Sequence, residues 1–530
     1  MSVAKKNFED RMTDIGNRAG AMRETLVFSV TGDDGGFLPS AVQKDALAKS
    51  VSGSVYEAAG GSAPMILGTH SKALQSFLRV HKRMPSDELL ASCHRSIENA
   101  LAVTMGRKPD GFVLESAEMG TTEGILMRDR MIALILPVML QSITSDMVTF
   151  VPGDYNQSEM FMVNRVAGST FGDLKKGDRI DYTYNGRYSV MDQRKEVGTG
   201  NGTKSGSSHE FKLDTSILFG KVYPLKRKSI RILHDHDVVA FDNGNGSIFG
   251  SFKVGSTTIN VTGTVDYATG IVDPVFSAAP ANGIKVDIGY DVDIEKDATL
   301  IPRIDHNMES QLLYPHESAI TAGVTLQALW GLRREFNLNA DNMAMSAMRN
   351  LLAKDKDSKI LRDLYYYAKG STSWNYTVPE NIYFQEYYET LKEVLLGIDT
   401  TLKLRTGISG LVGLVADPKA ANVFKSMRDP FFVADPGYRS SAQPSRIGRV
   451  FGMWDLYEDP NAVSYSCLCY AKGSEHGQAG YVAGDAIPAL SFKHPVLSDL
   501  QYKSTLWELA YRDVNPFFGR NYFTVLNMVP

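Results

Sequence analysis

The chain has 530 residues, more than one hydrophobic core usually covers, and ordinary domain sizes predict about three or four structural units. Hydrophobic residues make up 43% and charged residues 22%, which excludes wholesale disorder. Lys and Arg total 56 against 60 Asp and Glu, a net charge of −4. A general nucleic-acid binder is expected to carry a basic surplus, so this class is disfavoured.

Cysteine usage and apolar runs indicate a soluble protein made in a cytoplasm. Three cysteines, Cys93, Cys467 and Cys469, are too few for a disulfide framework and fit a reducing compartment. No apolar segment of a secretory signal follows the charged start of the chain. The most membrane-like run, residues 131–140, is half the length of a membrane span and contains Pro137.

The first 130 residues predict a loosely built region with short helices. Leu74, Phe77 and Leu78 recur at helical spacing over 71–82, and Ser86 is a plausible N-cap for a helix reaching about Met105. A third helix is expected over 122–140, broken or bent at Pro137.

From about 147 to 294 the pattern changes to β. Asn185-Gly186 predicts a hairpin turn, for which we favour an odd, three-residue loop that places the flanking tyrosines on one face. Residues 198–208 read as a flexible Gly-rich stretch. A second β unit spans 240–296, where residues 284–294 alternate apolar with polar or acidic side chains, as in a half-exposed antiparallel strand.

Helices return after Pro302. Asn339 or Asp341 begins a long apolar-faced run to about residue 368, which is either one bent, solvated helix or two helices, and 380–396 predicts another helix. Asp417 followed by Pro418 predicts the start of a helix over 419–427. Strands are expected over 462–470, 480–486 and 523–528.

Five groups of residues could carry chemistry, and each has a plainer interpretation. Lys204-Ser205 lacks the preceding glycine of a phosphate loop, and the alternating His234–Asp237 cluster would point its histidines and aspartates to opposite faces of a strand. Cys467 and Cys469 could share a soft metal, but no second pair exists, so small buried residues are favoured. The adjacent Ser474, Glu475 and His476 cannot form a relay alone, and the tyrosines of 365–367 and 387–388 are expected in a core or an interface. The sequence therefore predicts no catalytic, cofactor-binding or metal-binding residues, and no enzyme.

From about Gln141 onward the chain resembles the major capsid proteins of tailed bacteriophages, which have the Hong Kong 97 fold. The segments that carry the resemblance are MIALILPVMLQSITSDMVTFV at 131–151, residues 162–211, residues 301–330, ISGLVGLVADPKAANV at 408–423, IGRVFGMWDLY at 447–457, GYVAGDAIP at 480–488, and 511–527. The order of elements carries it more than any single motif, and residues 447–457 resemble one glycine-bearing strand that ends in an aromatic residue.

The resemblance implies an α+β fold with six parts. These are an N-terminal arm and helical region (1–130), a helix plus an extended β-hairpin called the E-loop (131–214), an inserted β domain (215–300), a peripheral domain with a long spine helix (301–400), an axial domain (401–490) and the return strands of the peripheral domain (491–530). One relative cross-links a lysine to an asparagine between subunits. Lys195 and Lys204 lie in the corresponding loop, but nothing in the sequence identifies such a pair.

The function implied is a structural one: self-assembly, as hexamers and pentamers, into an icosahedral shell around double-stranded phage DNA without sequence-specific binding. Expected partners are further copies of the chain, scaffold and portal proteins and possibly decoration proteins, with no cofactor and no membrane. The expected location is the virion, after assembly in the bacterial host cytoplasm. Two alternatives stay open, a tail sheath or tube protein and a multidomain hydrolase with an accessory β domain.

Overall fold

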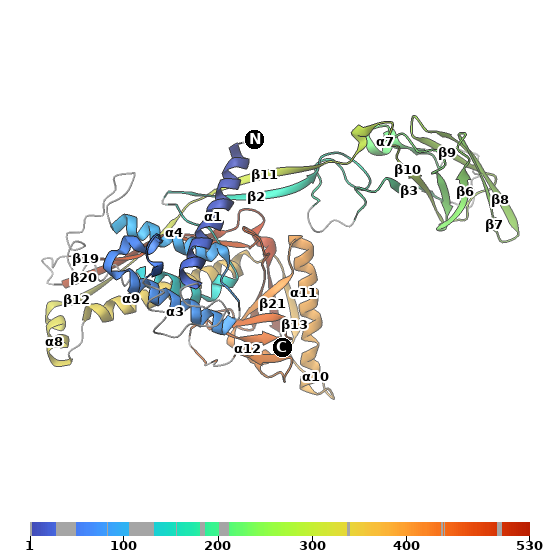
Figure 1. Cartoon of the computed structure of the whole chain (residues 1–530). Helices are drawn as coiled ribbons and strands as arrows, with labels where there is room; N and C mark the ends of the chain where they lie inside the picture. Colours follow the sequence, from blue (N-terminus) through green and yellow to red (C-terminus); the bar gives the residue numbers. More distant parts are fainter. Residues whose placement is uncertain are drawn as a thin grey trace. The chain divides into compact units, whose positions relative to one another are not determined.

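The computed structural model of the chain (Figure 1) describes residues 3–27, 49–81, 83–104, 132–154, 156–180, 186–200, 211–336, 340–435, 438, 440–441, 443–494 and 501–529. They form two compact units, of which unit 1 comprises 1–162 and 308–530 and unit 2 comprises 163–307. Both helices and sheets are present, so the predicted α+β class is confirmed. The six-part division proposed from the sequence stays a prediction.

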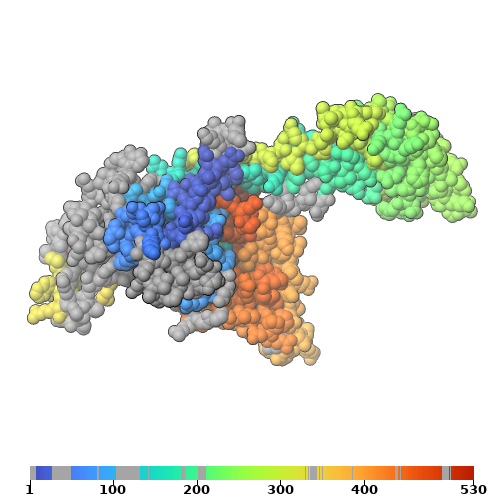
Figure 2. Space-filling view, in the orientation of Figure 1, coloured from blue at the N-terminus to red at the C-terminus, as the bar shows by residue number. Residues whose placement is uncertain are grey.

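Unit 1 begins with helices. They are α1 (Val3–Val27), the 3₁₀ helix η1 (Val55–Ser62), α3 (Ala63–His81), α4 (Asp87–Thr104), α6 (Ile135–Gln141) and η2 (Ile143–Asp146). Helices α3 and α4 confirm the predictions for 71–81 and from Ser86 on, and the Ser86 hydroxyl accepts a hydrogen bond from the Leu89 amide. The 25-residue α1, which packs against α4, was not predicted; Figure 2 shows its outer surface in dark blue.

The helix expected to be broken or bent at Pro137 is interrupted a few residues earlier, by a turn at Ala133 and Leu134. Pro137 is the third residue of α6, which begins at Ile135 after Leu134. In a first turn the backbone amides have no partner within the helix, so a proline costs no hydrogen bond there. Residues 122–131 of the helix expected over 122–140 lie outside the described residues.

A four-stranded sheet in unit 1 has the order β1-β19-β20-β12. Its strands are β1 (Thr149–Phe150), β12 (His316–Thr325), β19 (Tyr481–His494) and β20 (Gln501–Val514). Only β1 and β19 are parallel. Helices α4 and α9 (Ala340–Tyr367) both pack against this sheet. The long helix is thus one element, which decides between the two sequence alternatives, and Asp341 lies inside it rather than capping it.

A seven-stranded mixed sheet has the order β13-β21-β18-β14-β17-β16-β15. The strands are β13 (Ser371–Asn375), β14 (Leu411–Ala416), β15 (Phe432–Ala434), β16 (Ser445–Val450), β17 (Trp454–Glu458), β18 (Ser466–Ala471) and β21 (Phe523–Val529). Helices α11 (Leu391–Thr406) and α12 (Pro418–Lys425) pack on it, and α8 (Leu326–Phe336), α10 (Phe384–Glu389) and η4 (Gly519–Tyr522) complete the unit.

Sequence predictions for the two sheets of unit 1 are confirmed in part. The Asp417 carboxylate accepts a hydrogen bond from the Lys419 amide and caps α12, as predicted. The strands predicted at 462–470, 480–486 and 523–528 correspond to β18, β19 and β21. Residues 447–457, which we expected to be one strand, instead form the antiparallel pair β16 and β17, because Phe451 and Gly452 take positive φ angles and reverse the chain.

One continuous hydrophobic core joins the N-terminal helices of unit 1 to the seven-stranded sheet. It runs from Ile15 and Leu26 of α1 through Leu101 and Leu364 to Leu468. A smaller cluster beneath β20 holds Leu506 against Met348 and Leu352 of α9. The elements that the chain order separates most widely are therefore held together by buried apolar contacts.

Unit 2 contains an eight-stranded antiparallel sheet in the order β3-β10-β5-β6-β7-β8-β9-β4. The strands are β3 (Asp192–Thr199), β4 (Leu213–Asp214), β5 (Arg231–His234), β6 (Asp237–Asp242), β7 (Ser247–Val254), β8 (Thr257–Asp266), β9 (Ile271–Phe276) and β10 (Lys285–Asp291), accompanied by α7 (Thr215–Phe219) and η3 (Ala298–Leu300). Val286, Ile288 and Tyr290 are buried, which confirms the alternation predicted for this strand.

The expected pairing of residues 162–211 as a separate hairpin is wrong. The chain enters unit 2 in β2 (Ser158–Ala167) and leaves it in β11 (Ile304–Leu313), and these two strands pair with each other. Strand β3 pairs with one edge of β10 instead, and β5 pairs with the other edge. Tyr188 and Val190 lie outside the strands, and the Asn185 turn lies outside the described residues.

Candidate functional site

Most of the chemistry-bearing residues singled out in the sequence lie apart. His234 to Asp237 do not lie on one strand: Asp235 and His236, both with positive φ, form the two-residue turn between β5 and β6. His234 is buried against Phe252. Among the described residues, no three His, Cys, Asp or Glu side chains gather into a group that could hold a metal ion.

The cysteines behave as small core residues. Cys467 and Cys469 are fully buried in β18 as free thiols, and burial raises the pKa of Cys467 well above its usual value. A thiol held neutral in this way is a poor nucleophile and a poor metal ligand. Lys204 and Ser205 lie outside the described residues, and Lys195 lies in β3 opposite Ile288.

The Ser474–His476 segment makes a contact that its sequence did not predict. The His476 Nδ1 atom lies 3.0 Å from the Glu88 carboxylate of α4, which also accepts hydrogen bonds from the Thr149 hydroxyl and the Phe150 amide. Burial alone would raise the pKa of Glu88, but the His476 contact and the Lys472 charge lower it overall. The carboxylate thus joins a helix to a strand and a loop.

Lys472 lies close to the same group. Its ammonium donates to the Val148 carbonyl at 2.7 Å, and burial lowers its pKa despite the nearby Glu88 and Asp146 carboxylates. The signal for this cluster was absent from the local sequence, because its members come from distant segments.

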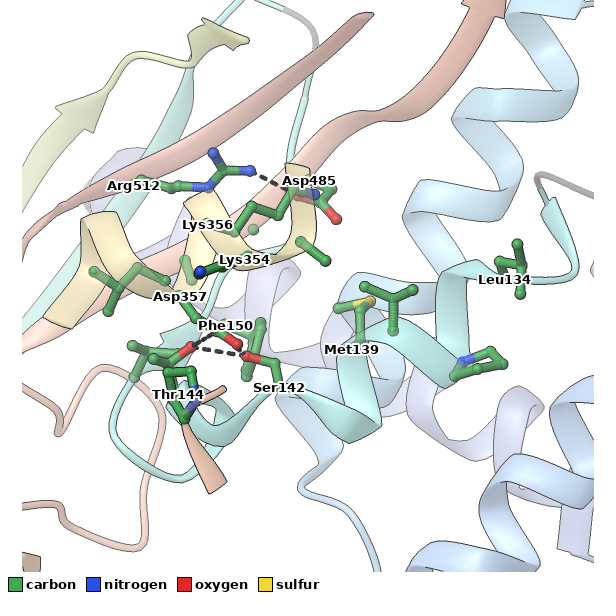
Figure 3. A pocket seen from close by; sticks show the side chains of 18 of the residues that line it. Leu134, Met139, Ser142, Thr144, Phe150, Lys354, Lys356, Asp357, Asp485 and Arg512 are labelled. Carbon is green, nitrogen blue, oxygen red and sulfur yellow. Dashed lines mark hydrogen bonds and ion pairs between the residues drawn. The ribbon is translucent and has the colours of Figure 1, made fainter. Parts of the chain in front are cut away.

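A cavity of about 410 Å³ in unit 1 lies among α6, α9 and the β19–β20 pair (Figure 3). The Lys356 ammonium on α9 lies 2.6 Å from Glu508 and 3.5 Å from Asp485. The Arg512 guanidinium also lies 2.6 Å from Glu508, which is fully buried. Two cations and two carboxylates therefore balance one another.

Asp357 completes the cavity wall beside this quartet. It accepts hydrogen bonds from the Ser142 and Thr144 hydroxyls at 2.5 and 2.9 Å, and burial raises its pKa. These ion pairs and hydrogen bonds connect α9 to α6, η2 and the β19–β20 pair and hold the helix on the sheet.

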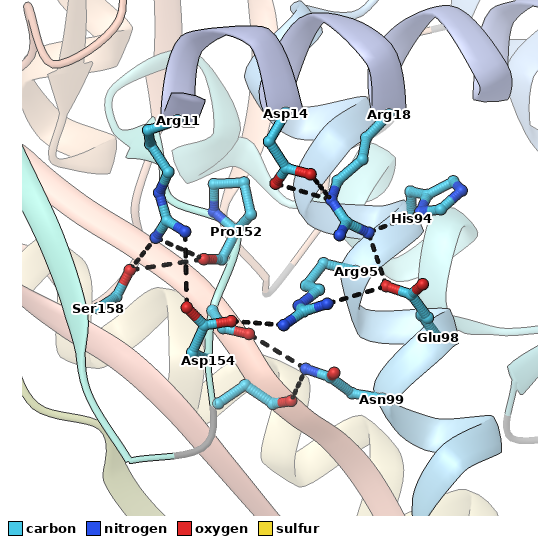
Figure 4. A network of polar contacts seen from close by, with 12 residues as sticks. Arg11, Asp14, Arg18, His94, Arg95, Glu98, Asn99, Pro152, Asp154 and Ser158 are labelled. Carbon is cyan, nitrogen blue, oxygen red and sulfur yellow. Dashed lines mark hydrogen bonds and ion pairs between the residues drawn. The ribbon is translucent and has the colours of Figure 1, made fainter. Parts of the chain in front are cut away.

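A second polar network fastens α1 to the rest of unit 1 (Figure 4). Asp154 lies between Arg11 of α1, at 3.5 Å, and Arg95 of α4, at 2.6 Å. Glu98 lies 2.6 Å from Arg18 of α1 and 3.1 Å from Arg95. The network, like the apolar face of α1, serves to hold the N-terminal helix in place.

Several large apolar side chains of unit 1 are exposed on its surface. Trp330 on α8 is 68% exposed and Leu404 on α11 is 72% exposed. Further exposed apolar side chains are Leu326, Ile382, Tyr383, Phe384, Leu396, Val433, Met453 and Val463. Of the tyrosine runs, Tyr365, Tyr387 and Tyr388 pack on the core as predicted, whereas Tyr366 is 80% exposed. These exposed apolar side chains are therefore spread over several separate elements of unit 1.

Several solved structures resemble parts of the chain at low scores. The icosahedrally averaged capsid of jumbo bacteriophage PhiKZ matches with a TM-score of 0.32 and 9% identity, covering 72% of this chain and 91% of the other. The capsid of Myoviridae phage XM1 gives 0.30 and 10%, covering 61% and 94%. The SrpI encapsulin of Synechococcus elongatus gives 0.30 and 11%, covering 44% and 79%. None of the described helices is long and apolar enough to cross a membrane.

Two sequence comparisons concern smaller parts of the chain. Residues 3–142 match a family model described as a domain of unknown function, DUF8615. The Escherichia coli protein IncB is 31% identical over 182 residues, a match that covers 31% of this chain and 84% of IncB. By this identity over most of the length of IncB, the chain belongs to the family of the Escherichia coli protein IncB.

Proposed function

We propose that the chain is a structural major capsid protein that assembles, as hexamers and pentamers, into an icosahedral shell enclosing phage DNA. The observation that carries the proposal is the apolar surface of unit 1, which is spread over α8, α10, α11 and the β15–β17 region. A subunit in a closed shell has neighbours on all sides, so each edge needs its own contact surface. An enzyme acting alone needs no such distribution.

The paired strands β2 and β11 support the same proposal. Among the described strands they form a sheet of two, and β11 is exposed along nearly its whole length, with Leu312 48% exposed. A two-stranded ribbon is marginally stable in water unless another surface covers it. We infer that a neighbouring subunit supplies this surface in the shell.

The order of elements also agrees with the resemblance seen in the sequence. A helical N-terminal region precedes a ribbon, a long helix of 28 residues follows, and then a mixed sheet with two helices. The internal balance of the polar clusters fits a structural role, because no described cluster presents an unpaired, activated group at a cavity. Scaffold, portal and decoration proteins and assembly in the host cytoplasm belong to this proposal.

Expression of the full chain, with and without the structural genes next to its own, tests the proposal. Negative-stain images and sedimentation should show closed shells or capsomer-sized rings. Substituting both Trp330→Ser and Leu404→Ser should leave the subunit folded and reduce assembly at least about tenfold, because both side chains are exposed in the subunit.

Glu393→Ser on α11 provides a matched control that removes a long, exposed side chain without removing an apolar contact. Tubes instead of shells would favour the alternative of a tail sheath or tube protein. Discrete monomers under every condition would contradict both structural proposals.

A further inference from the structure

Strand β12 lies at one edge of the four-stranded sheet of unit 1, beside β20 (Figure 1). It pairs with β20 over all ten of its residues, from His316 to Thr325, without a bulge. In an antiparallel edge strand, alternate backbone amides and carbonyls point away from the neighbouring strand. Among the described residues, no backbone group bonds to this outer edge of β12. The edge therefore presents a regular row of backbone donors and acceptors to which another strand can add.

The outer edge of β12 lacks the features that usually keep edge strands from pairing. Proteins protect such edges with prolines, lysines, bulges or a short length. Residues 316–325 contain no proline, lysine or arginine, and the ionisable side chains among them are His316 and Glu317 at the beginning of the strand. One face of the strand is half-buried toward α9, and the other face exposes small or polar side chains, namely Glu317, Ala319, Thr321, Gly323 and Thr325. An edge of this length and composition is suited to a partner strand.

The sequence of β12 is complementary to itself. Residues that lie directly opposite each other in a sheet point to the same face. For two copies of β12 to keep their half-buried side chains on one face of a continuous sheet, even-numbered residues must lie opposite even-numbered ones. An antiparallel pairing about Ile320 meets this condition and places Glu317 of each copy opposite Gly323 of the other. No like charges lie opposite each other along the strand in this register.

Strand β20 supplies the charge that favours this register. Lys503 lies opposite Gly323, and its Cγ atom is 3.7 Å from the position that a Cβ atom on Gly323 would occupy. The lysine side chain thus lies against Gly323, which has no side chain to separate it from the free edge. In the pairing about Ile320, Glu317 of the second copy lies on the other side of Gly323 and on the same face. Two equivalent pairs of opposite charge then form across the two copies.

We propose that β12 pairs antiparallel about Ile320 with β12 of a second copy of the chain, so that one continuous sheet crosses two subunits. The inference rests on the proposed function and deepens it, because it names one contact between the subunits of the shell. A second copy is favoured over a foreign peptide because the chain itself supplies the complementary charges, Glu317 and Lys503. The contact uses the same surface on both copies, so it closes as a pair and leaves the exposed apolar side chains of unit 1 to join pairs into larger assemblies.

A charge-reversal cycle on the full chain tests the pairing. Within one copy, Glu317 lies opposite Leu509, so about 20 Å along β20 separates it from Lys503, and coupling between the two charges must come from a second copy. Sedimentation at graded concentrations in low salt measures self-association. Glu317→Lys and Lys503→Glu should each weaken it at least about tenfold, because each variant replaces two attractive pairs by two repulsive ones. The double variant exchanges the charges and should associate nearly as the unmodified chain does.

Lys253→Glu is the matched control, because this exposed lysine lies on β7, which is paired along both edges. It should associate normally, and circular dichroism checks that each variant is folded. Thiol cross-linking tests the register, and the three natural cysteines are buried and should not react. A short thiol cross-linker should join an equal mixture of Ala319→Cys and Thr321→Cys more efficiently than either variant alone, because these exposed residues lie directly opposite each other across the pair.

The proposal is overturned if the two single charge variants associate normally or if cross-linking does not favour the mixture. It is also overturned if the double variant associates as weakly as the single variants, which would assign β12 to a contact with a different surface. Electron microscopy scores shell formation separately. Normal shells from Glu317→Lys and Lys503→Glu would overturn the strand pairing and leave the capsid proposal standing. Dimers that depend on Glu317 and Lys503 but never form shells would support the pairing and contradict the capsid proposal.

Discussion

The two units of the chain differ in where their closest charge clusters lie, although unit 1 also has ion pairs on its surface. Unit 1 buries its clusters: Glu508 is fully buried with Lys356 and Arg512, and Glu88 is enclosed near Lys472. Unit 2 keeps its ion pairs on the outward face of a sheet, where Arg231 and Asp192 are both about half exposed. The difference indicates that contacts between distant segments fix the helices of unit 1, whereas regular alternation within strands suffices for unit 2.

The largest loss of stability that this comparison predicts follows removal of the Glu508 side chain. Glu508→Ala leaves Lys356 and Arg512 buried without their closest counter-ion, so we expect a loss of about 3–5 kcal/mol in the free energy of unfolding of unit 1. Denaturant titration, followed by protease resistance of α9, measures it. Glu389→Ala, which removes a half-exposed carboxylate 3.7 Å from an exposed Arg428, is the control and should cost less than about 1 kcal/mol. Equal effects of the two variants would contradict the contrast.

A second test asks whether the two cores respond separately. Ile288→Ala deletes a fully buried side chain from unit 2 and should cost about 2–5 kcal/mol there, through lost burial and a cavity. Hydrogen exchange should show faster amide exchange in β5 and β10, with β14 and β18 of unit 1 unchanged. Leu414→Ala in unit 1 should give the reverse pattern. Equal loss of protection in both units would show that the cores are one cooperative structure.

The same comparison explains which elements could be predicted from the sequence. Strand β10 and the Asp417 cap of α12 depend on neighbouring residues, and both were found. Helix α1 was missed although Ile15, Ala19, Met22 and Leu26 recur at helical spacing, because charged residues dominate the segment. The β2–β11 pairing could not be found, since strands distant in sequence leave no local signal for their register.

The candidate sites were harder still to predict. The Glu88–His476 contact and the Lys356–Glu508–Arg512 cluster join residues far apart in the chain. Adjacent sets such as Ser474–His476 attracted attention for their residue types alone. The pairing of Phe241 with Phe249 likewise depends on the register of β6 and β7, which the sequence does not give.

An intermediate loss of stability is expected on lowering the pH, because of the buried His70 in α3. The ring is fully buried, with Nδ1 2.9 Å from the Tyr56 hydroxyl and Nε2 3.1 Å from the Ile132 carbonyl, and burial lowers its pKa to about 4 from 6.5. Below pH 6.5 the unfolded chain takes up a proton that the folded chain does not, so stability is lost as the pH falls from 6.5 towards 4. Between about pH 7.5 and about pH 5 the loss should reach about 2 kcal/mol.

Denaturant titrations at these two values measure this loss, and His70→Gln should remove about that much of the pH dependence. His316→Gln, on the exposed strand β12, provides the control and should leave the pH dependence nearly unchanged. An identical pH profile for His70→Gln and the unmodified chain would show that the buried imidazole does not govern the acid sensitivity of the N-terminal helices.

The smallest effect is expected for the surface pair of unit 2. Asp192 and Arg231 lie 2.7 Å apart, but their side chains are 55% and 43% exposed, so water screens the attraction and both side chains lose entropy in forming the pair. A double-mutant cycle with Asp192→Asn and Arg231→Gln should give a coupling of at most about 1 kcal/mol at low salt. In about 1 M NaCl, where charges more than roughly 3 Å apart are screened, the coupling should fall close to zero. The cost of Glu508→Ala in unit 1 should hardly change with salt, because that carboxylate is shielded from solvent ions. The comparison of the two units would be contradicted if the Asp192–Arg231 coupling stayed the same in high salt. It would also be contradicted if the stability cost of Glu508→Ala fell with added salt.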